Sequence, residues 1–257
     1  MTQKYPVGAP SWIDLGTTDV AVAARFYGSL FGWALSDPGP DSGGYRMFLK
    51  DGRQVAGVGP AMDPARGTSW AVYFATEDVE DAARKVQAHG GRVVMEPMDV
   101  LDQGRMAVFT DPAGAFFSVW QPGEHTGAEV TDEHGSFTWT ELMAADIDSC
   151  KEFYPRVLGV TTRDVPMGDG PPYTLLEAEG RPVAGAMPID PAWGPMPTRW
   201  TVYFAVDHCD AVYQEALNLG ATSSVPPQDS PAGRFAGLVD PQGGAFSIIK
   251  NNPDLTV

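Results

Sequence analysis

The chain has 257 residues, 43% of them hydrophobic, which is enough for two domains of ordinary size. Its formal net charge of −16 at pH 7 argues against nucleic acid or an anionic membrane as a partner and favours a neutral or cationic small molecule. No apolar run approaches the roughly 20 residues of a membrane span and the N-terminus has no apolar core of a signal peptide, so we expect a soluble, cytoplasmic protein.

The first half of the chain contains two modules with the same order of elements. Thr18 or Asp19 caps a helix that runs to about Leu30, where Gly32 ends it, and a second helix covers residues 78–88. The predicted strands are 12–16, 33–36, 45–50, 55–59, 70–75, 92–95, 106–110 and 116–120. Each module therefore reads β-α-β-β-β.

The second half repeats the first. Residues 104–120 return as residues 233–249 with eight of seventeen positions identical, and both copies contain an Asp-Pro-x-Gly turn. Since the offset between matching motifs stays between 127 and 130 residues, the chain is a tandem duplication with small loop indels. The predicted helices of this half are 147–158 and 210–219, and its strands are 137–142, one near 160, 173–178, 183–187, 200–206, one near 222, 235–239 and 245–249.

The repeat predicts two tandem domains, at residues 11–121 and 136–250, joined by a linker at residues 122–135. Together the four modules predict an α+β fold of mixed sheets with the helices on one face. The linker is polar and rich in turn residues. We interpret its His125 and His134 as solvated side chains rather than metal ligands, because nothing around them fixes a coordination geometry.

Three features together resemble the vicinal oxygen chelate superfamily: the fourfold module, the Asp-Pro-x-Gly hairpins, and a strand–helix opening that carries Phe26-Tyr27 with its copy Phe153-Tyr154. This superfamily includes glyoxalase I, extradiol dioxygenases, fosfomycin-modifying transferases and bleomycin-binding proteins. The resemblance covers about residues 11–250 and implies two glyoxalase-like domains, each a curved mixed sheet around a cavity with the helices outside. Tandem members are described as hydroxylases or antibiotic-accessory proteins of actinomycetes, and the fold alone does not choose among these activities.

The resemblance also indicates where a divalent metal would be held. The matching positions carry Trp12, Ala71, Ser118, Trp139, Thr201 and Ser247. None of these offers the imidazole, carboxylate or thiolate that such a cation needs, so we expect neither a metal nor another cofactor. A shift of two residues would bring in Asp14 and Glu141, but neither would have a second ligand at the matched positions.

The resemblance implies a ligand cavity lined by the side chains that share the inward face. The expected lining residues are Trp12, Asp14, Tyr45, Tyr73, Phe116, Ser118 and Trp120 in the first half, and Trp139, Glu141, Tyr173, Tyr203 and Ser247 in the second. Trp and Tyr on strands are more often core residues, but their place in the family's cavity favours lining. An indole beside a carboxylate suits a planar aromatic or amine-bearing molecule. Because Ile249 replaces Trp120 in the second half, we expect the first half to be the better site.

Two hypotheses of function follow. The first is metal-independent binding of a hydrophobic aromatic small molecule, such as an antibiotic or a polyketide, for self-resistance or as a biosynthetic accessory. The alternative is a lyase or oxygenase (hydroxylase) that is metal-dependent, or cofactor-free with Asp14 or Glu141 as general base. We assign no catalytic residue, and the oligomeric state stays open between monomer and homodimer.

Two pairs of reactive or charged residues have simpler interpretations. Cys150 and Cys209 lack the spacing of a zinc site and occupy non-equivalent positions, so we expect neither a disulfide nor a metal there. A helix start can acidify a cysteine such as Cys209, although a purely structural role is favoured. Arg105 and its repeat equivalent Arg234 could bind an anion, but surface arginines at the entrance of each hairpin are the favoured interpretation.

Overall fold

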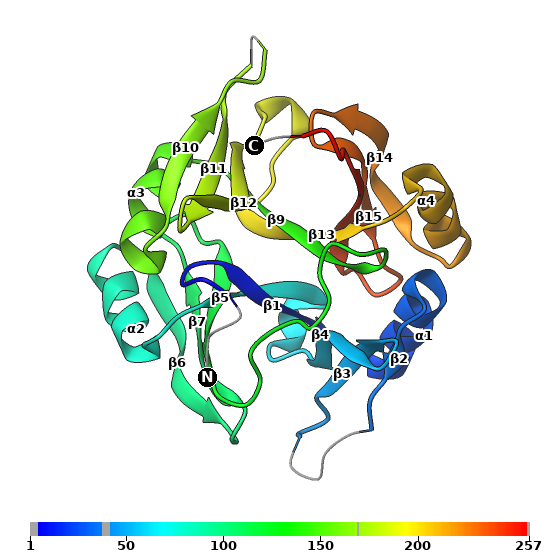
Figure 1. The fold of residues 1–257 in the computed structure, drawn as a ribbon, viewed down its shortest axis with the longest axis horizontal. Coiled ribbons are helices and arrows are strands. Elements are labelled where there is room, and N and C mark those ends of the chain that lie inside the picture. The colour runs from blue at the N-terminus through cyan, green and yellow to red at the C-terminus, as the bar shows by residue number, and fades with distance from the viewer. Residues whose placement is uncertain (1–4, 38–41, 169, 256–257) are drawn as a thin grey trace. The chain divides into compact units, whose positions relative to one another are not determined.

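The computed structural model describes residues 5–37, 42–168 and 170–255. Residues 1–4, on which part of the argument against a signal peptide rests, lie outside the described residues. In the described ranges the chain forms four α-helices and sixteen strands, in the order of four β-α-β-β-β modules (Figure 1). No helix in this part of the chain is both long and apolar enough to span a membrane.

The helices are α1 (Val20–Phe31), α2 (Val79–Ala88), α3 (Ile147–Leu158) and α4 (Cys209–Asn218). The strands of the first half are β1 (Pro10–Thr17), β2 (Ala34–Leu35), β3 (Arg46–Lys50), β4 (Arg53–Pro60), β5 (Ser69–Ala75), β6 (Arg92–Val100), β7 (Gly104–Thr110) and β8 (Phe116–Pro122). Those of the second half are β9 (Ser136–Ala144), β10 (Thr161–Val165), β11 (Tyr173–Ala178), β12 (Arg181–Pro188), β13 (Arg199–Ala205), β14 (Thr222–Ser230), β15 (Gly233–Val239) and β16 (Ala245–Asn251).

The strands form two eight-stranded mixed sheets. Their orders are β2-β3-β4-β1-β5-β8-β7-β6 and β10-β11-β12-β9-β13-β16-β15-β14. The pairs β1–β4, β5–β8, β9–β12 and β13–β16 are parallel, whereas the hairpin pairs are antiparallel. The predicted α+β fold of four modules is confirmed.

Two edge strands are longer than predicted. The patterns predicted strands at 92–95 and near 222, whereas β6 and β14 each extend over nine residues. Both contain proline, Pro97 in β6 and Pro226-Pro227 in β14. Edge strands tolerate proline because one side of their backbone has no neighbouring strand that needs an N–H donor.

The chain folds as two compact units, and each unit takes one module from either half. The Tyr27 unit comprises Ile13–Ala71, Ala128–Thr138 and Thr201–Val257. The Tyr154 unit comprises Met1–Trp12, Val72–Gly127 and Trp139–Trp200.

The core of the Tyr27 unit is built on α1, which lies beside α4 (Figure 1). Asp19 accepts hydrogen bonds from two backbone N–H groups of the first turn of α1, and Gly32 ends the helix in the left-handed conformation at φ 73°. The buried face of α1 carries Tyr27, whose ring packs among other aromatic rings at centroid distances of 5.4–6.2 Å. These neighbours are Phe31, Trp33, Phe48, Trp70 and Phe246.

The Tyr154 unit repeats this construction on α3, which lies beside α2 (Figure 1). Asp146 caps α3 through the backbone N–H of Ser149 at 3.1 Å. The Tyr154 ring packs edge-on against Phe117 and Trp200 at 5.5 and 5.3 Å between centroids. Each unit therefore buries the Phe-Tyr pair of one helix in an aromatic core.

A tyrosine, an aspartate and a tryptophan are hydrogen-bonded together inside each unit. Tyr27 donates to Asp240 at 2.9 Å and accepts the indole N–H of Trp70 at 3.0 Å. The other oxygen of Asp240 accepts two backbone N–H groups of its own Asp-Pro-x-Gly turn, each at 2.8 Å. The Phe-Tyr helix of the first half is thus bonded to the Asp-Pro-x-Gly turn of the second half, and not to the turn of its own half.

The Tyr154 unit contains the same arrangement with the halves exchanged. Tyr154 donates to Asp111 at 2.9 Å and accepts from the indole of Trp200 at 3.0 Å. Asp111 also accepts the N–H groups of Ala113 and Ala115. The repeated Phe-Tyr pairs and Asp-Pro-x-Gly turns therefore stabilise the two cores. The candidate site is formed by other residues.

Candidate functional site

Three of the expected ligand-binding residues form a hydrogen-bonded group in the Tyr154 unit, here called the Glu141 cluster: Trp139, Glu141 and Tyr173. Trp139 and Glu141 lie two residues apart on β9 and share one face of the strand. Tyr173 begins β11 and donates its hydroxyl proton to Glu141 Oε2 at 2.7 Å. The indole Nε1–H of Trp139 donates to the Tyr173 hydroxyl at 3.0 Å. Glu141 is only 8% exposed, whereas the two rings are half-buried.

A glycine makes room for this cluster. Gly185 on β12 pairs with Glu141 across the parallel β9–β12 ladder. A Cβ atom at Gly185 would overlap the hydroxyl of Tyr173, so the phenol can lie across β12 only because this residue has no side chain. The sequence contains a sign of this arrangement, since Gly185 ends the repeated Val-Ala-Gly motif.

The first half carries the equivalents of the carboxylate and the tyrosine, Asp14 and Tyr45, in the Tyr27 unit. Tyr45 donates to Asp14 Oδ2 at 3.3 Å, and Asp14 pairs with Gly57 across the β1–β4 ladder. A Cβ atom at Gly57 would again overlap the tyrosine hydroxyl. The bond is 0.6 Å longer than its counterpart at Glu141, which agrees with the shorter aspartate side chain.

Trp12 and Trp120, both expected to line a cavity, enclose a histidine in the Tyr154 unit. The ring of His125 lies 4.4 Å from Trp12 and 5.7 Å from Trp120 between centroids, edge-on to both. The indole of Trp120 also donates to the backbone oxygen of His125 at 2.9 Å. Trp12 is 3% exposed and His125 8% exposed. The interpretation of His125 as a solvated linker residue is therefore wrong, because the indoles of Trp12 and Trp120 cover its ring.

The other expected lining residues lie on paired strands. Tyr73 and Ser118 face each other in register on β5 and β8, and both are buried. Tyr203 and Ser247 take the same register on β13 and β16, with the Tyr203 ring 6.5 Å from Phe235. Phe116, the first residue of β8, is half-buried.

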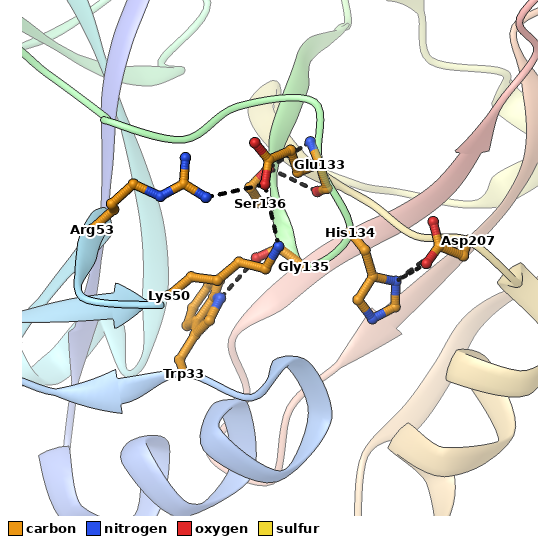
Figure 2. A network of polar contacts seen from close by, with 8 residues as sticks. All are labelled: Trp33, Lys50, Arg53, Glu133, His134, Gly135, Ser136 and Asp207. Atoms are coloured by element: carbon orange, nitrogen blue, oxygen red, sulfur yellow. Dashed lines mark hydrogen bonds and ion pairs between the residues drawn. The ribbon is translucent and has the colours of Figure 1, made fainter.

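The segment 128–138 is attached to the Tyr27 unit by polar contacts (Figure 2). Glu133 accepts from Arg53 at 3.2 Å and forms an ion pair with Lys50 at 3.5 Å, and Arg53 holds the pKa of this carboxyl below its usual value. The indole of Trp33 donates to the Gly135 oxygen at 2.7 Å. His134 is partly exposed, and its Nδ1 accepts the backbone N–H of Asp207 at 3.1 Å and lies 3.5 Å from the carboxylate of the same residue.

The donor groups at the metal positions of the family do not fit a divalent cation. Trp12 and Trp139 present indoles there, and Ser118 and Ser247 present hydroxyls, none of which is an ordinary ligand for such an ion. Among the residues that the structure describes, no group of three His, Cys, Asp or Glu side chains is placed to hold a metal. We therefore derive no chemistry through a metal ion.

The reactive and charged pairs have structural roles. Arg105 is paired with Glu80 and Asp99, and Arg234 is paired with Asp210 and Asp229, so both are surface arginines as favoured. The cysteines are buried and free of disulfide. Burial raises the pKa of Cys150 to about 12 and that of Cys209 to about 11, so the helix start does not acidify Cys209.

Residues 9–119 match a family model described as the Glyoxalase/Bleomycin resistance protein/Dioxygenase superfamily, and residues 139–249 match a glyoxalase-like domain. The anthracycline biosynthesis protein DnrV of Streptomyces peucetius is 42% identical over 264 residues, covering 96% of this chain and 94% of the relative. The anthracycline biosynthesis protein DauV of Streptomyces sp. (strain C5) is 41% identical with the same coverage. A Mn(II)-bound glyoxalase from Novosphingobium aromaticivorans shares the fold, with a TM-score of 0.64 at 18% identity over 95% of this chain and 82% of that one.

Proposed function

Since the chain belongs to the glyoxalase/bleomycin resistance protein/dioxygenase superfamily, we propose that it binds a hydrophobic aromatic small molecule, without a metal ion, in a cavity of the glyoxalase type. The observation that carries this proposal is the chemistry of the Glu141 cluster. An indole, a phenol and a carboxylate are linked by hydrogen bonds, and the indole, Trp139, stands at a position where the resemblance to the family implies a metal ligand. Aromatic faces hold a planar ligand by stacking, and the carboxylate orients it.

The relatives support a role in antibiotic metabolism. Two proteins that are 41–42% identical to this chain over nearly their whole length are named for the biosynthesis of anthracyclines, which are fused-ring aromatic compounds. A protein that binds such a compound serves either as an accessory of its biosynthesis or in self-resistance. The proposed ligand is therefore an aromatic antibiotic or a polyketide intermediate.

Titration with a fused-ring aromatic probe tests this function. We expect 1,8-dihydroxyanthraquinone to quench the tryptophan fluorescence saturably, with the same Kd in the presence and absence of a chelator. Trp139→Ala should weaken binding roughly tenfold, because it removes one aromatic face and the donor that orients Tyr173.

Trp193→Ala is the matched control, since this indole belongs to the same unit but is 49% exposed on the short 3-10 helix Pro191–Trp193. Its loss should leave Kd unchanged. Binding that disappears with the chelator would contradict metal-independent binding, and turnover that disappears with the chelator and returns with added Mn²⁺ or Fe²⁺ would establish a metal-dependent enzyme.

A further inference from the structure

Resting on that proposed function, we infer that the ligand site is the Glu141 cluster of the second half, and that its ligand is a planar aromatic cation such as a protonated aromatic amine. In the first half the equivalent of Trp139, Trp12, is covered by another side chain of the protein, His125. Three independent observations lead to this assignment.

The first observation is the direction of the hydrogen bonds. The Tyr173 hydroxyl has one proton, which it gives to Glu141, and it accepts the indole N–H of Trp139. The tyrosine is thus oriented from one side and holds the carboxylate from the other. An ionised carboxylate can only accept hydrogen bonds, so any ligand group that contacts Glu141 has to be a donor. Because Glu141 is only 8% exposed, its carboxylate interacts more favourably with a positively charged donor than with a neutral one.

The second observation is the contrast between the two halves. The indole of Trp12, equivalent to Trp139, is covered by the ring of the chain's own His125, which lies between Trp12 and Trp120. A planar ligand would have to displace this imidazole. Trp139 is half-buried and keeps part of its ring accessible, and the tyrosine–carboxylate bond beside it is the shorter of the two. This reverses the expectation that the first half is the better site.

The third observation is the distribution of charge. The Tyr154 unit, which holds the cluster, contains ten basic and 18 acidic residues. Its surroundings are therefore net negative. A negative potential around the cluster attracts cations and disfavours anions.

A set of three probes with similar ring systems tests the inference: 9-aminoacridine, which is protonated at neutral pH, neutral anthracene, and the anion anthracene-9-carboxylate. Binding to the full-length chain is measured by calorimetry and fluorescence at low salt. We expect one equivalent of 9-aminoacridine to bind at least about tenfold more tightly than the neutral probe, the factor typical of one hydrogen bond to a charged group. The anion should bind most weakly.

Glu141→Gln keeps the size of the side chain and should remove this preference, while Asp14→Asn is the matched change in the first half and should leave it intact. Thermal unfolding of both variants checks that they are folded. Neutral and cationic probes of equal affinity, or a preference that survives in Glu141→Gln and is lost in Asp14→Asn, would overturn the inference while leaving aromatic binding established. A protein that binds none of the probes would contradict the proposed function itself.

Discussion

At the scale of single residues, the buried tyrosine of each unit is the side chain on which we expect the stability of the core to depend most. Tyr154 links a carboxylate, Asp111, to an indole, Trp200, through two hydrogen bonds. Burial raises the pKa of Asp111, whose charge is compensated by Tyr154 and by the N–H groups of its turn. If one donor is removed, the buried acceptor has still lost its hydration on folding but no longer gains a hydrogen bond in exchange, which destabilises the folded state.

Tyr154→Phe should therefore lower the free energy of unfolding by about 1–3 kcal/mol, because it leaves Asp111 short of a donor and Trp200 short of an acceptor. Chemical denaturation measures this loss. Tyr213→Phe on α4, where the ring is half-exposed, is the control and should change stability by less than about 0.5 kcal/mol. Equal effects of the two substitutions would contradict the role given to the buried hydroxyl.

The same two tyrosines predict instability in alkali. Burial, reinforced by the negative charges of Asp240 and Asp111, raises the pKa values of Tyr27 and Tyr154 well above the usual 10. The unfolded chain ionises first, so their contribution to stability is complete below about pH 10 and is lost as pH rises above it. Ultraviolet titration should show these two phenols ionising only together with unfolding. Ionisation of all eight tyrosines in a still folded chain would refute this.

At the scale of elements, the candidate site depends on three strands, β9, β11 and β12, and on one glycine. Glu141 faces Gly185 across the ladder, and the phenol of Tyr173 lies over that glycine. The ladder fixes the register, and a change by one residue would turn Glu141 to the other face of the sheet. The geometry of the cluster is thus a property of strand pairing, not of β9 alone.

Gly185→Ala should displace Tyr173 and weaken binding of the aromatic probe about tenfold or more, because the new methyl group overlaps the phenol and breaks its bond to Glu141. Fluorescence titration measures the change. Gly57→Ala places the same methyl group against Tyr45 in the first half and should cost stability but not affinity. The reverse pattern would move the site to the first half.

At the scale of the whole molecule, each compact unit combines the two halves of the duplication. Tyr27 and Asp240 are 213 positions apart in the sequence, yet they form one hydrogen bond inside one core. Either half alone would separate a buried tyrosine and a buried aspartate from the partners that accept and donate their hydrogen bonds. The domain bounds 11–121 and 136–250 stay a prediction of sequence similarity, and they do not coincide with the units that pack together.

Chains cut between residues 135 and 136 should therefore not fold as monomers when expressed separately. Mixing the two fragments should restore cooperative unfolding, because only the mixture supplies both members of each tyrosine–aspartate pair. Circular dichroism and analytical ultracentrifugation measure folding and association. A first fragment that unfolds cooperatively as a monomer would show that the halves are independent.

The local elements were predictable because they depend on short-range patterns. Asp19 at a helix start, Gly32 at its end and alternating apolar residues are visible in the sequence, and α3 and β11 have the bounds that the pattern predicted. The duplication and the family could also be recognised, since they rest on motifs compared along one chain. The residues of the Glu141 cluster were among those expected, but the hydrogen bonds that link the indole to the carboxylate through the Tyr173 hydroxyl were not.

Only the tertiary structure decided which segments meet. The tyrosine of each Phe-Tyr helix is hydrogen-bonded to the Asp-Pro-x-Gly turn of the other half. Tyr173 contacts Glu141 because Gly185 has no side chain in the way, and His125 lies against two indoles. Such contacts join residues that are far apart in the chain, and they form because buried donors must find acceptors and aromatic rings must fill a core. No local periodicity records these long-range choices, so the sequence by itself determined the elements of this protein and the fold determined their partners.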